Sequence, residues 1–414
     1  MNALAQRFIA HTRRNGLRSA TKRSLKYLSA SHEPVVQGLN ESAPDAPRKI
    51  DLIGHYAQIL GHAHGLGDMP PTSTKRGDSL IQWVIPNFGF GSGGHLNIFR
   101  FINLLADAGF PQRLVILPPH NWDSVASATD TITRWYFPLK AEIALGVGGF
   151  RPASATFATG WQTAYWVHHH EKSRRKFYFV QDHEPDFYAR SSETILAENT
   201  YRLGLTGITA GTWLKKKLAQ DYAMKCHAVS FACDTEFYQP TEKRANENFN
   251  ILFYARHVTP RRLFELGLLA LAEACKRHPD IAVIFAGGDV GRYQIPFHHL
   301  NAGELTLKEL PDLYSQCDLS LVLSGTNLSL LPLELAACRC PIVLNDSPSA
   351  NWLLPRGAAF YAKPSVEDLS RVITRAYSNE KQRNQKRDKA FDIAMTSSWS
   401  NEAQKIIDIL ERAE

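Results

Sequence analysis

The 414-residue sequence predicts an α/β protein with two doubly wound domains in tandem. Strand-like and helix-like segments alternate along the chain in two series, which a polar stretch at residues 239–249 separates. Such alternation is typical of a parallel sheet with helices on both faces. The length and the 44% hydrophobic content also suit two domains with separate cores.

The first series begins with an apolar strand at residues 81–86, followed by a helix at residues 95–108 whose apolar spacing stops at Gly109. It continues with strands at residues 114–117, 176–180, 205–209 and 228–232, and with helices at residues 191–203 and 212–222. Trp161, Tyr165 and Trp166 are expected in the core, and the run 168–170 of three histidines as a polar helix end.

The second series follows the polar linker. We expect strands at residues 251–255, 281–286, 319–323 and 342–344, and helices at residues 262–277, 307–316 and 330–337. A last helix is expected at residues 401–413. The predicted organisation is a basic arm at residues 1–48, an N-terminal domain at 49–240, a C-terminal domain at 241–396, and a C-terminal helix, 397–414, packing back on the N-terminal domain.

The charge of the chain is unevenly distributed. The net charge is +7, and residues 1–32 carry seven basic residues and no acidic residue, so the remainder has 40 of each sign. Residues 1–30 are therefore expected to form either an amphipathic basic helix on an anionic membrane surface or a solvated tail, with nucleic acid a weaker alternative. No apolar run approaches the ~18 residues that span a bilayer. The six cysteines form no C-x-x-C pair and are expected to be reduced thiols of a cytosolic protein.

A glycine-rich loop follows the first strand. Gly89, Gly91 and Gly94 satisfy the G-x-G-x-x-G pattern of dinucleotide-binding domains. However, the second strand runs into two prolines and lacks the acidic residue that holds a ribose, which disfavours an NAD-dependent oxidoreductase. A ligand-free tight turn is one alternative. The other is close backbone approach to a phosphate or sugar, with the helix start at His95 supplying positive charge.

The second domain carries residues suited to a nucleoside diphosphate. Arg256 ends a strand, and Arg261 and Arg262 are expected to open the next helix, where forked guanidinium groups can bind a diphosphate. The polar loop 324–329 can direct backbone N–H groups at phosphate oxygens. Glu334 follows this loop and can accept hydrogen bonds from ribose hydroxyls. A surface arginine pair and an ordinary helix glutamate are the alternatives.

The order of these features resembles the retaining glycosyltransferases of family 4. The resemblance runs from about residue 80 to the end and rests on "GFGSGGHLNIFRFINLLADAG", "CHAVSFACDTEFYQP", "ILFYARHVTPRR" and "LPLELAACRCPIVLND". It implies the GT-B architecture, in which two Rossmann-like domains face each other across a cleft. With "FYFVQDHEPDFY", the chain looks most like bacterial rhamnosyltransferases of surface polysaccharide and surface-layer glycan synthesis.

The resemblance implies specific donor contacts. It places the diphosphate on Arg256 and on Arg261 or Arg262, and the ribose on Glu334. The family's paired glutamates have seven residues between them, and Thr326 stands where the first is expected. The remaining predicted donor-binding residues are Asn327, Leu328, Ser329, Gly93 and Gly94.

The turn Asp182-His183-Glu184 follows a predicted strand and is expected at the cleft, where it could orient sugar hydroxyls or act in proton transfer. Together with His95, these residues are predicted to bind the acceptor, and Asp182 and His183 join Arg256 and Arg261 as predicted catalytic residues. A carboxylate-rich turn held by Pro185 is the structural alternative.

The predicted function is transfer of a sugar, expected to be L-rhamnose from dTDP-rhamnose, with retention and without a metal or cofactor, to a hydroxyl of a growing bacterial surface glycan or lipid-linked glycan. The expected location is the cytoplasm, with the arm on the inner face of the cell membrane. Two other classes stay open. One is a non-catalytic nucleotide- or glycan-binding subunit of a membrane-associated glycan assembly complex, suggested by Thr326 and by the basic arm. The other is the NAD-dependent oxidoreductase.

Overall fold

The computed structural model describes residues 51–61 and 80–412. Residues Asp51–Glu414 form one compact unit. The basic arm predicted at residues 1–48 lies outside the described residues, and so does the end of the C-terminal helix predicted to reach residue 413.

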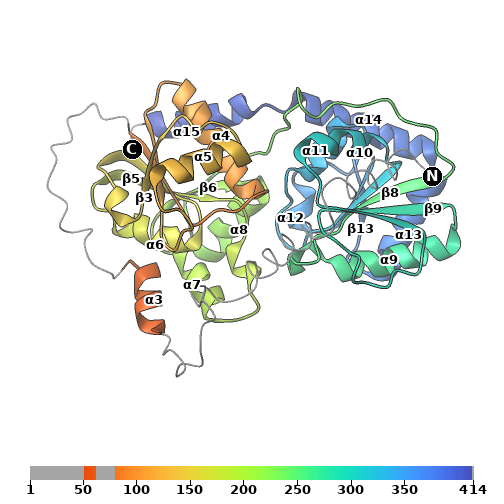
Figure 1. Ribbon diagram of the computed structural model, residues 1–414, viewed down its shortest axis with the longest axis horizontal. Helices are drawn as coiled ribbons and strands as arrows, with labels where there is room; N and C mark the ends of the chain where they lie inside the picture. Colours follow the sequence, from red (N-terminus) through yellow and green to blue (C-terminus); the bar gives the residue numbers. More distant parts are fainter. Residues whose placement is uncertain (1–50, 62–79, 413–414) are drawn as a thin grey trace. The chain divides into compact units, whose positions relative to one another are not determined.

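Two parallel sheets organise the described part of the chain (Figure 1). The strands of the seven-stranded sheet, in the order β3-β2-β1-β4-β5-β6-β7, are β1 (Ile81–Ile85), β2 (Gln112–Ile116), β3 (Glu142–Leu145), β4 (Ala153–Ala158), β5 (Ser173–Val180), β6 (Thr206–Ala210) and β7 (Cys226–Val229). Those of the six-stranded sheet, in the order β10-β9-β8-β11-β12-β13, are β8 (Phe249–Tyr254), β9 (Ile281–Ala286), β10 (His299–Gly303), β11 (Leu319–Val322), β12 (Ile342–Asn345) and β13 (Phe360–Ala362).

Helices precede the first strand, connect many of the strands and follow the last one. Those associated with the first series are α3 (Leu52–Ile59), α4 (Gly93–Asp107), α5 (Val125–Trp135), α6 (Trp161–His169), α7 (Ser192–Thr200) and α8 (Thr212–Tyr222). The second series has α9 (Phe264–Arg277), α10 (Leu310–Ser315), α11 (Leu331–Ala337), α12 (Pro348–Asn351), α13 (Val366–Ser378), α14 (Glu380–Thr396) and α15 (Trp399–Glu411). The doubly wound α/β prediction is confirmed.

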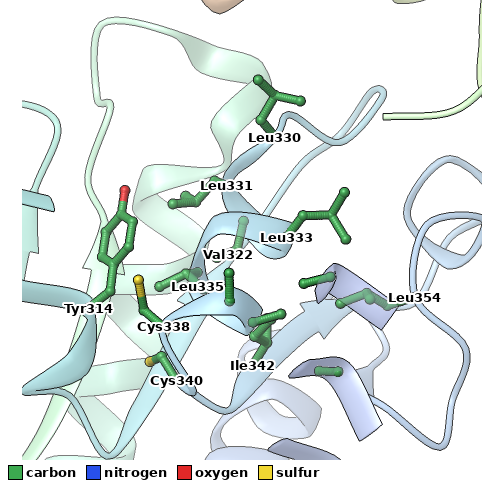
Figure 2. Packing of buried hydrophobic residues seen from close by; sticks show 14 of the residues in the cluster. Tyr314, Val322, Leu330, Leu331, Leu333, Leu335, Cys338, Cys340, Ile342 and Leu354 are labelled. Carbon is green, nitrogen blue, oxygen red and sulfur yellow. The ribbon is translucent and has the colours of Figure 1, made fainter. Parts of the chain in front are cut away.

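Both faces of each sheet are buried, which explains why the strands are nearly continuous apolar runs. In β1, Trp83 packs in one core cluster with residues of α4, whereas Val84 packs in another with residues of α6 and α8. In the second sheet, Phe253 belongs to the cluster that includes α9 and α13, and Leu252 to the cluster that includes α11 and α14. Figure 2 shows this last cluster, in which Leu335 and Ile342 pack between α11 and the sheet.

The helix α15 packs against the first sheet's core although it follows the second series. Ile406 is fully buried in the same cluster as Trp83, and α15 contacts α4 and β7. The Glu402 carboxylate accepts a hydrogen bond from the Ser230 N–H at 2.7 Å. The chain therefore crosses back to its first sheet before it ends.

Several element boundaries differ from the sequence prediction. The helix expected from His95 begins at Gly93, because Ser92 provides the N-cap. The helix expected from Arg262 begins at Phe264, because Leu263 has a left-handed φ of 53° that separates it from the 3₁₀ turn Pro260–Arg262. The helix expected at 307–316 is a 3₁₀ turn, Leu307–Glu309, followed by α10.

Four strands of the structure, β3, β4, β10 and β13, were not predicted from the sequence. β13 has only three residues and β3 four, and these are too few for periodicity to distinguish from loops. The expected core residues Trp161, Tyr165 and Trp166 are buried, and the three histidines lie at the end of α6. All six cysteines are buried and none forms a disulfide. Among the described residues, no helix is long and apolar enough to span a membrane.

Candidate functional site

The strand order reverses between β1 and β4 in the first sheet and between β8 and β11 in the second. In open parallel sheets, ligands bind outside the carboxyl ends of the strands at such a switch point. The glycine-rich loop follows β1, Arg256 follows β8, and the loop 324–329 follows β11. The predicted donor residues of the second domain therefore lie at the position that the topology itself favours.

The glycine-rich loop is fixed by local hydrogen bonds. The Ser92 hydroxyl lies 2.8 Å from His95 Nδ1 and accepts from the His95 N–H, and the Tyr136 hydroxyl donates to the Gly89 carbonyl. Burial lowers the pKa of His95 to about 4, so the imidazole is neutral at pH 7. His95 lies in the first turn of α4, two residues after the helix start.

Gly93 and Gly94 differ in their surroundings. A Cβ at Gly93 would meet no atom of the chain within 4 Å, whereas one at Gly94 would lie 3.4 Å from Gln181 Nε2. The Gln181 amide donates to the Gly94 carbonyl at 2.9 Å and accepts from the Asn97 amide at 3.0 Å. Gly93 thus leaves open space at the start of α4, and Gly94 packs against the end of β5.

Asp182, two residues after the end of β5, is a buried carboxyl group surrounded by donors. Its oxygens accept from the Asn327 N–H and the Thr326 hydroxyl, each at 2.8 Å, and from the His183 N–H. Burial raises the pKa of Asp182, and the Asn327 N–H and the Arg262 charge act in the opposite direction. The two domain sequences predicted separately therefore meet at this side chain.

The neighbours of Asp182 are held inside the first sheet's domain. The Glu184 carboxylate accepts from the Trp161 N–H at the start of α6 and from the Tyr178 hydroxyl, both at 2.7 Å, and burial raises the pKa of Glu184 to about 7. His183 Nε2 lies 3.1 Å from the Tyr222 hydroxyl. Both Glu184 oxygens thus have partners within the domain, and acceptor binding by Asp182, His183 and Glu184 stays a prediction.

The three predicted arginines have different environments. Arg262 is occupied, because its Nη1 donates to the Ser324 hydroxyl at 3.0 Å and to the Asn327 carbonyl at 3.3 Å. The contact of Arg256 is one long hydrogen bond of 3.5 Å to the Tyr254 hydroxyl. Arg261 lies 4.0 Å from Asp182 and over the Phe187 ring, and its buried Nε has no hydrogen-bond partner.

These arginines also repel one another. Burial lowers the pKa of Arg261, and the charges of Arg262 and Arg256 lower it further. Like charges gathered in a partly buried place are unfavourable unless an anion joins them. The free donors of Arg256 and Arg261 therefore suit an anionic group, and Arg262 supports the loop.

The loop 324–329 is bonded to the first sheet through Asn327. Its Nδ2 donates to the Gln181 and Ala210 carbonyls, each at 2.8 Å, and its Oδ1 accepts from Trp352 Nε1 at 2.6 Å. The Trp352 ring packs directly against Gly211. A Cβ atom at position 211 would lie only 2.6 Å from this ring, too close for any side chain. We call the contacts of Asn327 and Thr326 with residues 181, 182 and 210 the Asn327 clasp.

The other residues of this loop and of α11 that were predicted to bind the donor substrate are buried or already have partners within the chain. Leu328 is buried, and the Ser329 hydroxyl accepts from the Leu331 N–H. Burial raises the pKa of Glu334 to about 7, against the effect of a hydrogen bond from Tyr238, the Arg100 charge and a hydrogen bond from Tyr314. Glu334 therefore already has hydroxyl partners, and ribose binding by this residue stays a prediction.

Sequence reasoning missed several residues that build this region. Gln181 holds the glycine-rich loop and Trp352 the Asn327 clasp. Gln181 stands in the stretch "FYFVQDHEPDFY" but was not predicted as a site residue, and Trp352 lies in none of the quoted stretches. Phe90 is 51% exposed and packs edge-on against Trp135 in the glycine-rich loop. An exposed aromatic ring suits sugar stacking, and its place between Gly89 and Gly91 was the available signal. No group of His, Cys, Asp or Glu side chains within the described part of the chain is arranged to hold a metal ion.

Sequence comparisons match both halves of this site. Residues 249–374 match the family description "WsaF, C-terminal domain", and residues 146–210 match "WsaF, N-terminal domain". The O-antigen biosynthesis protein RfbC of Myxococcus xanthus is 32% identical over 345 residues, which are 78% of this chain and 26% of RfbC. The chain thus spans about a quarter of the length of this curated relative.

Solved structures share the fold. HepE from Anabaena, in complex with UDP and glucose, has a TM-score of 0.61 at 15% identity, covering 80% of this chain and 99% of HepE. A variant of TarM from S. aureus, in complex with fondaparinux, alpha-GlcNAc-glycerol and UDP, has a TM-score of 0.65 at 8% identity, covering 80% of this chain and all of TarM. The fold is therefore GT-B, with two Rossmann-like sheets, as the sequence predicted.

The Asn327 clasp predicts a large effect of one substitution. Asn327→Ala removes the partner of the buried Ala210 carbonyl and of two partly buried groups, the Gln181 carbonyl and the Trp352 N–H. We therefore expect a loss of about 3 kcal/mol in the free energy of unfolding. Urea denaturation followed by tryptophan fluorescence measures it. Asn401→Ala, at an exposed helix position, is the matched control. Equal stability of the two variants would contradict the clasp.

Proposed function

We propose that the chain is a glycosyltransferase that moves a sugar from a nucleoside diphosphate donor to a hydroxyl of a glycan during surface polysaccharide assembly. The observation that carries the proposal is the crowding of Arg256 and Arg261, with free donors, at the switch point of the second sheet. The WsaF match, the RfbC relative and the GT-B fold support it.

The donor diphosphate binds Arg256 and Arg261 in this proposal. Both guanidinium groups follow β8, and each can form forked, charge-assisted hydrogen bonds with phosphate oxygens. Arg262 holds Ser324 and the Asn327 carbonyl and so fixes the loop that supplies further contacts. Glu334 takes the ribose by exchanging a tyrosine hydroxyl for a ribose hydroxyl.

The proposed reaction is a front-face transfer with retention. The bond between the anomeric carbon and the diphosphate oxygen breaks, and the acceptor oxygen forms its bond on the same face. The acceptor proton passes to the departing phosphate oxygen, so no strong protein base and no metal are required. The arginines stabilise the charge that develops on the diphosphate.

The acceptor is proposed to bind beside the glycine-rich loop. Asp182 and His183 lie at the end of β5, next to β4, and the neutral His95 lies in the first turn of α4. Phe90 offers an exposed ring on which a sugar can stack. Gly93 leaves the space that close approach of the acceptor and donor requires.

The sugar is proposed to be L-rhamnose, carried by dTDP. This rests on the resemblance of "FYFVQDHEPDFY" to bacterial rhamnosyltransferases. The similarity to an O-antigen biosynthesis protein supports the glycan product and not the identity of the sugar. The presence of Thr326 instead of a glutamate favours one competitor, a non-catalytic nucleotide-binding subunit. Release of free nucleotide from donor only when acceptor is present distinguishes the enzyme, since a binding subunit would release none.

The basic arm is proposed to bind the inner face of the cell membrane. Its seven cations each contribute about 1 kcal/mol near an anionic surface. The seven cations are Arg7, Arg13, Arg14, Arg18, Lys22, Arg23 and Lys26. A variant with glutamine at all seven positions should co-sediment less with phosphatidylglycerol vesicles and should bind the donor as before. Unchanged sedimentation of this variant would refute the membrane role.

Donor binding predicts a thermal shift. dTDP and dTDP-rhamnose should raise the melting temperature of the chain, and Arg256→Ala should abolish the rise because it removes a diphosphate ligand. Arg371→Ala, whose guanidinium is paired with Asp368 on α13, is the control and should keep the shift. A larger shift with UDP or GDP sugars would reject rhamnose alone, whereas no shift with any nucleotide would reject the donor site.

Gly93→Ala separates binding from folding. The added methyl group meets nothing in the chain and favours the helix by about 1 kcal/mol, so stability should not fall. It occupies the space proposed for substrate, so kcat/KM for transfer should fall about tenfold or more. Gly148→Ala is the matched control, because its Cβ is equally unobstructed. Equal rates for the two variants would remove Gly93 from the site.

A further inference from the structure

A hollow of about 160 Å³ lies in the second domain, between β13, α13 and α14. Its lining includes Arg356, Arg375, Gln382 and Lys386, together with apolar and aromatic residues but no acidic residue. These elements are labelled in Figure 1. The hollow is large enough for several water molecules, each of which takes ≈ 30 Å³ in the liquid.

The hollow is separate from the proposed donor site. Arg356 and Ala359 precede β13, and Arg375 lies in the last turn of the helix that follows this strand. The hollow therefore lies at the edge where the parallel strands begin. Arg256 and the loop 324–329 follow β8 and β11, at the opposite edge of the same sheet.

The charges around the hollow are strongly unbalanced. Arg356 pairs with Asp346 at 2.7 Å, but the Arg375 guanidinium has no hydrogen-bond or ion-pair partner among the described residues. The Lys389 ammonium group lies against Gly357, the residue after Arg356, because a Cβ atom at position 357 would be 3.1 Å from Lys389 Nζ. Outside residues 1–32, basic and acidic residues are equal in number, so this local excess is not a property of the whole surface.

Lys386 is the most constrained of these cations. Its ammonium donates to the Arg356 and Ala359 carbonyls and lies 5.1 Å from the Phe360 ring centroid. Burial lowers the pKa of Lys386, and the charges of Arg375 and Lys389 lower it further. An anion in the hollow would relieve this repulsion. A basic residue in the last turn of α13 is favourable by itself, but that accounts for Arg375 alone.

We propose that this hollow binds a phosphate group, with Arg375 and Lys386 as its principal ligands and Lys389 at its rim. A phosphate presents several acceptor oxygens, which match the free guanidinium donors of Arg375 and the remaining ammonium proton of Lys386. The group comes from a soluble phosphate compound or from a phospholipid headgroup. Neither source depends on the sugar transfer proposed above.

The test is calorimetric titration with inorganic pyrophosphate. The full chain carries Arg256→Ala, which weakens the proposed donor site equally in every variant that is compared. We expect this protein to bind pyrophosphate, and added Arg375→Ala to weaken the binding at least about tenfold. Added Arg371→Ala should change it less than twofold, since Arg371 is on the same helix, paired with Asp368 and not in the lining.

A second measurement identifies the source of the phosphate. The Arg375→Ala and Arg371→Ala chains are compared for co-sedimentation with phosphatidylcholine vesicles with and without phosphatidylglycerol. A deficit of Arg375→Ala on anionic vesicles supports a lipid headgroup, and a deficit with pyrophosphate alone supports a soluble compound. The proposal is overturned if the Arg256→Ala chain binds neither probe, or if Arg375→Ala binds both as well as Arg371→Ala does.

Discussion

The arrangement of the candidate site depends on the Asn327 clasp. Parallel sheets place their ligand-binding loops at the carboxyl ends of the strands, but nothing in one sheet fixes its loops relative to those of another. Here the side chain of Asn327 uses both its donors and its acceptor, on Gln181, Ala210 and Trp352. Because the loop 324–329 is thereby tied to the ends of β5 and β6, the arginines held by this loop stand beside Asp182.

The charges follow from this constraint. Asp182 is a buried carboxylate, and its burial is compensated by donors from both halves of the chain and by the charges of Arg262 and Arg261. Arg262 donates its hydrogen bonds to the loop, whereas Arg261 and Arg256 keep free donors. The clasp thus creates a place where positive charge exceeds negative charge, and that excess is the physical basis for binding a diphosphate there.

The sequence predicted what depends on local pattern. The bounds of β9 and the placement of Arg256 after β8 follow from apolar runs and a polar stop, and the structure agrees. The start of α9 could not be predicted, because the left-handed backbone at Leu263 has no signature in a leucine. The different positions of Arg261 and Arg262 also could not, because they depend on contacts with Ser324 and Asp182, far away in sequence. The hydrogen bonds of Glu334 with the Tyr238 and Tyr314 hydroxyls could not be predicted either, because they also depend on the tertiary structure.

The departure at Thr326 has a structural explanation that the sequence alone did not offer. The resemblance led us to expect a glutamate carboxylate at this position. The Thr326 hydroxyl donates to Asp182 Oδ2 at 2.8 Å, so a carboxylate from the end of β5 stands next to it. The donors around Asp182, namely two backbone N–H groups, this hydroxyl and the nearby arginines, all favour its ionised form. Thr326 itself carries no carboxyl group, and the carboxyl group beside it comes from the turn after β5, in the other sheet. A glutamate at 326 would bring a second carboxylate against Asp182, so the two features are complementary.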